Sequence, residues 1–276
     1  MVYKIGWFST GRGPGSRNLL KTILDNIGSG TLNAEISFVF CSREQGEAEG
    51  SDRYLEMVKD HGLNLIAFSS RNYKPEMRKQ GTLNPDTMCK WRIEYDREIM
   101  QRVNHYQSNI NVLAGYMLIV GDEMCEKYDL INLHPASPDG PAGTWQEVIW
   151  KLIGEGATQS GVMIHLATKD LDEGPPITYC TFPLRDSAID PLWERHRQKL
   201  KAKSLEQIIQ EEGVNNELFK EIRKRGVTRE LPLIVQTLMT FSEGKVMIKD
   251  KQVMVAGKVQ QKPYCLTDQI EAFIKE

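Results

Sequence analysis

The sequence lacks the cysteine and histidine spacings that hold metals. Its five cysteines lie far apart, with no Cys-x-x-Cys pair, at Cys41, Cys89, Cys125, Cys180 and Cys265. The five histidines are equally dispersed, so no zinc site is predicted and we expect no bound metal. Isolated cysteines are typical of reduced thiols, which favours a cytoplasmic protein over one from an oxidising compartment.

Long apolar runs and an excess of one charge are also missing. No stretch approaches the roughly 18 apolar residues that a membrane span needs, and the start turns polar too early for a secretory signal. The net charge of −2 gives no electrostatic reason to expect binding to nucleic acid or membrane. We therefore expect a soluble protein with small-molecule partners, and the sequence sets no oligomeric state.

Short apolar runs alternate with helical patterns through the first two thirds of the chain. Residues 2–8 predict a strand, which breaks into a glycine-rich turn and then a helix with apolar residues at helical spacing until Gly28. Further strands are expected at 34–41, 63–68, 110–114, 129–134, 161–167 and 176–182. This alternation predicts an α/β fold, with a Rossmann-like, mostly parallel twisted sheet and flanking helices.

The last third has a different pattern. Ser204 and Gln207 form the sequence of a capping box that opens a helix, and Thr228 can cap another. Alternating residues on both sides of Asp250-Lys251 predict a β-hairpin. We predict a core at 1–185 and a C-terminal part of helices and hairpin at 186–276. The polar stretch 69–90, with Pro75 and Pro85, is predicted to be a long surface loop that acts as a mobile lid.

A glycine-rich turn that leads into a helix is the first candidate site. Such a turn presents backbone N–H groups at the positive end of a helix, which suits a phosphate. The spacing matches neither a Walker loop nor a dinucleotide fingerprint, so a plain tight turn is an equal alternative. The residues concerned are Gly11, Gly13, Gly15, Ser16, Arg17 and Asn18.

The strand end at Asn132-Leu133-His134-Pro135 is the second candidate. Alternate residues of a strand share a face, so Asn132 and His134 are expected to project together, where open α/β sheets bind ligands. An amide can donate to an oxyanion and an imidazole can exchange a proton near neutral pH. The alternative is that both side chains satisfy loop backbone.

Asp172, in the acidic turn Lys169–Pro175, is the third candidate. Acidic turns are more often solvated surface. A carboxylate that pairs with His134 would instead orient the imidazole and raise its pKa, which supports proton transfer.

Three segments, in order, resemble glycinamide ribonucleotide formyltransferase: VLAGYM at 112–117, INLHPA at 131–136 and GVMIHLATKDLDEGPPI at 161–177. The resemblance covers most of residues 1–185 and about 228–256. It implies an enzyme that transfers a formyl group from 10-formyltetrahydrofolate, a co-substrate, to a phosphorylated amine acceptor in purine biosynthesis.

The resemblance also implies residue roles. Asn132, His134 and Asp172 would be catalytic, and residues 11–18 would hold the acceptor's phosphate. The folate pocket would involve Arg92, Leu113, Gly115, Tyr116, Met117, Leu118, His165, Ala167 and Lys169.

Departures from the family pattern leave the acceptor open. Ala136–Gly140 stand where the family usually has Ser-Leu-Leu-Pro, Leu118 stands for an arginine, and Val227 lies nearest the family's ribose-binding glutamate. Another amine acceptor, hydrolysis of formyl-folate and a non-catalytic folate- or phosphate-binding protein are therefore alternatives. A Rossmann dehydrogenase is disfavoured, because no acidic residue ends the second strand.

Overall fold

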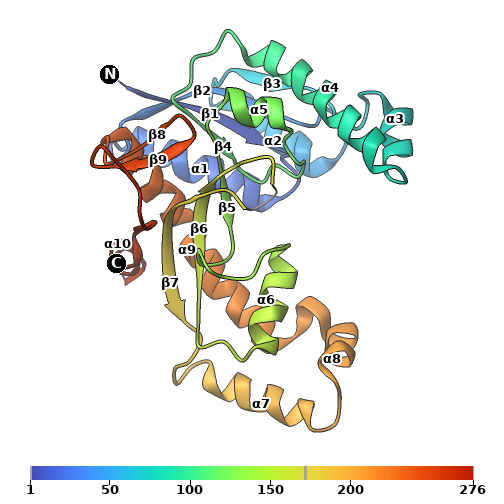
Figure 1. Ribbon diagram of the computed structural model, residues 1–276, viewed down its shortest axis with the longest axis vertical. Coiled ribbons are helices and arrows are strands. Elements are labelled where there is room, and N and C mark those ends of the chain that lie inside the picture. The colour runs from blue at the N-terminus through green and yellow to red at the C-terminus, as the bar shows by residue number, and fades with distance from the viewer. Residues whose placement is uncertain (1, 171–172, 276) are drawn as a thin grey trace. The chain divides into compact units, whose positions relative to one another are not determined.

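The computed structural model describes residues 2–170 and 173–275. Eight strands form one sheet in the order β11-β7-β6-β5-β4-β1-β2-β3, and a second sheet has the order β10-β9-β8 (Figure 1). The strands are β1 (Tyr3–Ser9), β2 (Ala34–Cys41), β3 (Leu65–Ala67), β4 (Ile110–Leu113), β5 (Leu130–His134), β6 (Gln159–Leu166), β7 (Pro176–Pro183), β8 (Val246–Lys249), β9 (Gln252–Val255), β10 (Lys258–Val259) and β11 (Tyr264–Cys265). From β3 through β5 the neighbouring strands pair in parallel, which confirms the predicted α/β class.

Several helices begin where the sequence supplies a side-chain cap or an N-terminal proline. Both Thr144 with Glu147 and Ser204 with Gln207 form complete capping boxes, and the second confirms the prediction. The helices are α1 (Pro14–Gly28), α2 (Glu49–Asp60), α3 (Pro75–Gly81), α4 (Pro85–Val103), α5 (Asp122–Lys127), α6 (Trp145–Gly154), α7 (Asp190–Leu200), α8 (Leu205–Glu212), the 3₁₀ helix η1 (Gly213–Asn215), α9 (Glu217–Ser242) and α10 (Thr267–Lys275). Within the part of the chain that the structure describes, no helix combines the length and apolar character of a membrane span.

Two compact units share the chain. The first comprises Met1–Asn132, His165–Pro175 and Leu238–Gln260, and the second comprises Leu133–Ile164, Pro176–Thr237 and Gln261–Glu276. The chain thus enters each unit more than once. A functional division at residue 185 stays a prediction.

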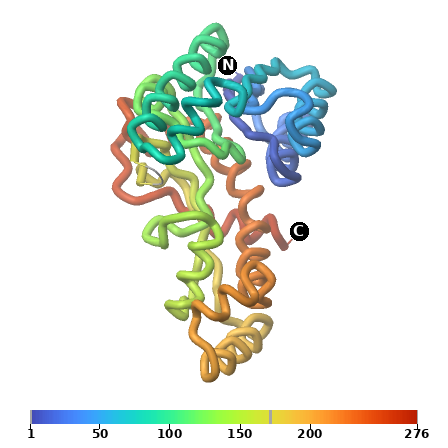
Figure 2. Tube along the Cα trace, turned by 90° about the vertical axis from the view of Figure 1, so that its right-hand side faces the viewer, coloured from blue at the N-terminus to red at the C-terminus, as the bar shows by residue number. Residues whose placement is uncertain are grey.

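The first unit has an aromatic core against its strands. Phe8, Phe38 and Phe40 pack with Trp91 and Tyr95 of α4, and all five side chains are buried. On the other side, buried apolar residues of α1 and α2 cover the strands; Figure 2 shows the α1–α2 region in blue and the α3–α4 region in teal and green on opposite sides of this unit. Helices on both faces leave the carboxyl ends of the strands for ligands.

The segment 69–90 corrects the prediction of a long surface loop. It contains α3 and the start of α4, and Pro75 and Pro85 each occupy the first turn of a helix, where a missing N–H costs nothing. The Trp91 indole donates to the Tyr73 carbonyl at 2.9 Å. The segment is therefore tied to α4, and no lid is needed to explain it.

Two predictions for the last third have different outcomes. The hairpin is confirmed: Asp250 and Lys251 have φ of 51° and 60°, as a two-residue turn requires. The prediction that Thr228 caps a helix is wrong, because α9 runs through it and its hydroxyl donates to the Lys224 carbonyl at 2.9 Å. In the second unit, Trp145 and Trp150 of α6 contact Phe219 of α9.

Candidate active site

The glycine loop joins β1 to α1 in the first unit. Gly13 is the N-cap of α1, no side chain caps the helix, and no acidic residue lies in its first turn. The first amides of a helix have no intrahelical partner. Uncapped and without a local carboxylate, they suit an anion.

The glycines of this loop differ in what they allow. Gly11 has φ +63°, and an added Cβ would lie 2.8 Å from the Tyr54 ring, so the fold itself requires glycine there. A Cβ on Gly13 or Gly15 would meet no atom within 4 Å. These two positions are therefore free of packing demands that would explain the glycines.

The side chains of the predicted phosphate loop differ in their exposure and in their contacts. Ser16 is buried, Asn18 is exposed, and Arg17 donates to the Gly50 carbonyl at 3.1 Å. Arg17 thus fastens the loop to the start of α2 through Nη1. Its other donors are not used by this bond.

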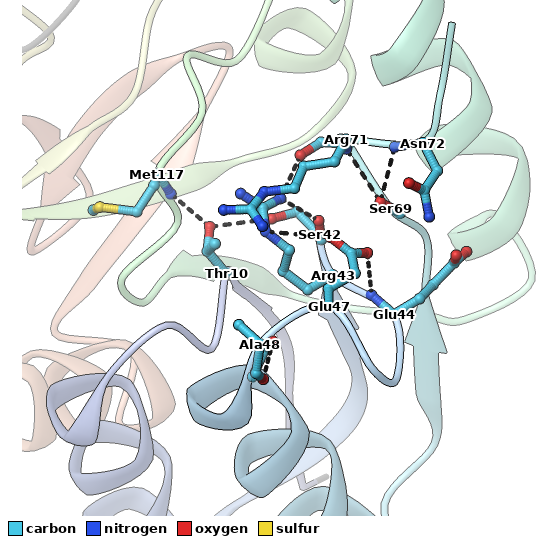
Figure 3. Close-up of polar contacts among 12 residues, drawn as sticks. Thr10, Ser42, Arg43, Glu44, Glu47, Ala48, Ser69, Arg71, Asn72 and Met117 are labelled. Atoms are coloured by element: carbon cyan, nitrogen blue, oxygen red, sulfur yellow. Dashed lines mark hydrogen bonds and ion pairs between the residues drawn. The ribbon is translucent and has the colours of Figure 1, made fainter. Parts of the chain in front are cut away.

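Thr10 connects the glycine loop to the turn after β4. Its hydroxyl accepts hydrogen bonds from the Met117 amide at 2.9 Å and the Ser42 hydroxyl at 3.1 Å (Figure 3). Gly115, with φ +65°, approaches Ser16 so closely that an added Cβ would lie 2.5 Å from its Oγ. The turn that the sequence predicts for folate binding is therefore held directly against the glycine loop.

A small pocket of about 80 Å³ lies behind this turn. Its walls combine apolar and polar surface, and its polar side chains include Asn132 and His165. It is lined by Leu113, Tyr116, Leu118, Ile119, Val120, Asn132, His165, Ala167 and Thr168. Typical ligand clefts measure about 300–1,000 Å³, so this pocket is small for a bicyclic ligand.

Asn132 is oriented by His165. The Asn132 Nδ2 lies 3.2 Å from the His165 Nε2, and the His165 Nδ1 lies 3.2 Å from the Leu166 carbonyl oxygen. A carbonyl can only accept, so Nδ1 carries the proton and Nε2 accepts from the amide. One amide hydrogen is thereby fixed, which leaves the second hydrogen and the amide oxygen of Asn132 for a ligand.

His134 belongs to the second unit and is buried there, at 3% exposure. Its Nε2–H donates to the Pro141 carbonyl at 3.3 Å. The segment with the unusual sequence Ala136–Gly140 forms the loop between these two residues, and the Gly140 amide donates to the Ser137 carbonyl at 2.8 Å. Asp172 lies outside the described residues.

The other predicted folate residues are only partly at the pocket. Leu113, Tyr116, Leu118, His165 and Ala167 line it, although the Tyr116 ring packs against Phe8 and Phe40. Met117 is exposed, and so is Lys169. Arg92 is on α4, and Val227 lies on α9 at an apolar pocket of about 330 Å³ in the second unit.

Sequence reasoning missed Asp96, a buried carboxyl on α4. It accepts a hydrogen bond from the Gly121 amide at 2.6 Å, at the end of the turn that lines the pocket. Burial raises its pKa to about 7, although the Gly121 amide and the Arg92 charge lower it. Asp96 supports the pocket from behind, and only its place one turn after Arg92 could have suggested this.

Residues 13–186 match the family model described as formyl transferase. The chain belongs to the formyl transferase family. A phosphoribosylglycinamide formyltransferase of Schizosaccharomyces pombe is 26% identical over 189 residues, which cover 66% of this chain and 85% of that protein.

Solved structures share the fold. A phosphoribosylglycinamide formyltransferase from Coxiella burnetii superposes with a TM-score of 0.66 at 20% identity, over 96% of this chain and 99% of that one. A formyltetrahydrofolate deformylase from Pseudomonas syringae reaches 0.60 at 19% identity, over 92% of this chain and 66% of that one. At these identities the structural likeness establishes the fold alone.

Proposed function

We propose that this chain transfers the formyl group of 10-formyltetrahydrofolate to the amine of glycinamide ribonucleotide, in the cytoplasm. Family membership and the curated relative named for this reaction support the reaction class. The observation that carries the proposal is Asn132, whose amide is held by His165 at the wall of a small pocket. An amide that is oriented before the reaction is a strong partner for a developing oxyanion.

The reaction needs few side chains. The amine nitrogen attacks the formyl carbon, a C–N bond forms, and the carbonyl oxygen becomes an oxyanion. Asn132 donates a hydrogen bond to that oxygen, and we assign His134 to the proton transfers. The bond to the folate nitrogen then breaks, and this nitrogen takes the proton that the amine loses. We assign Asp172 to the orientation of His134 during these transfers.

The acceptor's phosphate is proposed to bind the amides at the start of α1. The uncapped N-terminus and the open space at Gly13 and Gly15 favour this. The folate is proposed to enter the pocket behind the Gly115 turn, where backbone groups can recognise the edge of a planar ring. Widening of the 80 Å³ pocket accompanies its entry.

Hydrolysis of the formyl-folate is the second candidate, since a solved deformylase has the same fold. The two reactions differ in their product. Purified protein is mixed with 10-formyltetrahydrofolate labelled in the formyl carbon, with and without glycinamide ribonucleotide, and the label is followed in a single turnover. Label in the ribonucleotide supports transfer; label released as formate at the same rate without acceptor supports hydrolysis and contradicts the proposal.

A further inference from the structure

Three arginines gather at the carboxyl ends of β2 and β3, in the first unit. Arg43 follows β2 and donates from Nη1 to the Ser42 carbonyl at 2.7 Å and to the Ser70 hydroxyl at 2.5 Å. Arg78 of α3 donates to the Ser70 carbonyl at 2.8 Å. Arg71 lies between them along the chain, and Figure 3 shows its side chain extending toward Arg43 beside Ser42.

The cluster carries more positive than negative charge. Glu47 is the carboxylate paired with it, at 3.6 Å from the Arg43 Nε. Among the described residues, the exposed Arg71 side chain makes no hydrogen bond or ion pair. Three cations and one anion leave a net charge of about +2, and like charges near one another destabilise the protein unless an anion joins them.

The pKa of Arg43 reflects its burial and the excess of positive charge around it. Its side chain is only 12% exposed. Burial lowers its pKa, and the charges of Arg71 and Arg78 lower it further, whereas Glu47 opposes the shift. Burial is the largest of these causes, and Glu47 is the carboxylate that offsets it.

Arg43, Arg78 and Glu47 also have donor and acceptor atoms that no protein hydrogen bond uses among the described residues. In the part of the chain described, Arg43 and Arg78 form their hydrogen bonds through Nη1 alone, whereas a guanidinium has five N–H donors. Glu47 accepts from the Glu44 amide at 2.7 Å through Oε1, and its buried Oε2 has no hydrogen-bond donor among the described residues. The site thus offers several cationic donors and one acceptor.

This chemistry fits a phosphate ester with a neighbouring hydroxyl. Guanidinium forks match phosphate oxygens bidentately, and a carboxylate oxygen accepts from a sugar hydroxyl. The cluster adjoins Thr10, which is hydrogen-bonded to Ser42 and directly precedes the glycine loop.

We propose that Arg43, Arg71 and Arg78 form a second phosphate-binding site at the ends of β2 and β3, separate from the amides of α1, with Glu47 accepting a hydroxyl of the same ligand. The ligand is a sugar phosphate other than the acceptor, because the proposed function places the acceptor's single phosphate on the α1 amides.

Binding of inorganic phosphate and of ribose 5-phosphate to the full chain, without folate, tests the site. Arg71→Ala weakens the affinity for each ligand about tenfold, the size expected for charge-assisted hydrogen bonds. Arg53→Ala removes the same charge from α2, where Arg53 pairs with Glu49, and leaves both affinities unchanged. Equal affinities in the two variants would overturn the proposal.

Glu47→Gln gives a second test with the opposite sign. Loss of the only paired carboxylate strengthens binding of inorganic phosphate several-fold, because repulsion is removed. Ribose 5-phosphate gains less, since an amide oxygen accepts a hydroxyl less strongly than a carboxylate. Unchanged or weaker phosphate binding in this variant, with a wild-type melting temperature, contradicts the assignment.

Kinetics show whether this ligand is distinct from the acceptor. Arg71→Ala is expected to leave kcat and the KM values of acceptor and folate unchanged while it weakens phosphate binding at saturating acceptor. A tenfold rise in the acceptor KM would place the acceptor's phosphate on the arginines and overturn the assignment of a second site. A raised KM for folate without a change in phosphate affinity rejects the site. Failure of formyl transfer leaves the binding result intact, so the two proposals fail independently.

Discussion

The loops after β1, β2 and β3 carry hydroxyls and guanidiniums, whereas the turn after β4 and the start of the loop after β6 line a small pocket with Asn132 and His165. These residues all belong to the first unit. Charged groups in water bind charged ligands reversibly, while an oriented dipole in an apolar site acts strongly on a developing charge. Under the proposed function we expect acceptor recognition on the first side and chemistry on the second, so mutations should separate the acceptor KM from kcat accordingly.

Asn132→Ala is expected to have the largest effect. Loss of an oriented oxyanion donor lowers kcat about 10²- to 10³-fold, with little change in the acceptor KM or in thermal stability. Steady-state kinetics and thermal melts measure this. Asn104→Ala, at the end of α4, is the control. A loss of stability that parallels the loss of kcat would make Asn132 structural.

Gly115→Ala tests whether close packing holds the turn after β4 against the glycine loop. Alanine at this position would have a left-handed backbone conformation, and its Cβ would clash with the Ser16 Oγ. Together these are expected to lower the free energy of unfolding by about 2–3 kcal/mol. Adding Ser16→Ala removes the clash and restores part of this free energy, so that only the cost of the backbone conformation remains. Chemical denaturation of the single and double variants measures the recovery; strict additivity would show that the contact is not formed.

Asp96→Asn tests the support behind the pocket. The pKa of Asp96 in the folded protein, about 7, lies above the ordinary 3.8. The folded protein therefore loses stability as the pH rises from about 4 to 7, and this loss remains at higher pH. The asparagine keeps an acceptor for Gly121 and removes this cost, so it stabilises by on the order of 2 kcal/mol at pH 8 and by little at pH 4.

The measurement is the denaturation midpoint against pH, with exposed Asp60→Asn as the control. Destabilisation at every pH would instead show that the anion is needed, in balance with Arg92.

Gly13→Ala is expected to have the smallest effect and belongs to the recognition side. Its backbone is extended and its surroundings are open, so stability falls by less than about 1 kcal/mol. A phosphate on the α1 amides would meet the new methyl group, and the acceptor KM should rise about tenfold with kcat constant. Gly28→Ala, at the other end of α1 and equally open, is the control. An equal rise in the folate KM would remove the phosphate assignment.

The sequence predicted most strands of the main sheet well, because a buried strand is a short run of apolar residues that can be recognised without its neighbours. Residues 34–41 were expected as a strand and are β2. The segment 69–90 was mistaken for a loop because Pro75 and Pro85 were interpreted as helix breakers, whereas proline at the first turn begins a helix. Thr228 likewise had cap chemistry but lies inside α9, where tertiary packing prevails over local preference.

Site residues were predictable only where motif order carried the information. Asn132 was found in its strand, but its partner His165 lies 33 residues away, a contact that no local spacing reveals. The place of Arg43 beside Arg71 was missed for the same reason: the two residues follow different strands, and only the sheet order brings them together. The roles of His134 and Asp172 stay predictions.

Thr10 has a consequence for how the substrates affect one another. One hydroxyl accepts hydrogen bonds from Met117, in the turn at the pocket, and from Ser42, beside the arginines. A ligand that displaces the Met117 amide alters the same oxygen on which Ser42 depends. If binding on one side changes affinity on the other, the effect is reciprocal by the same factor, and the shared Thr10 oxygen is the atom through which we expect it to pass.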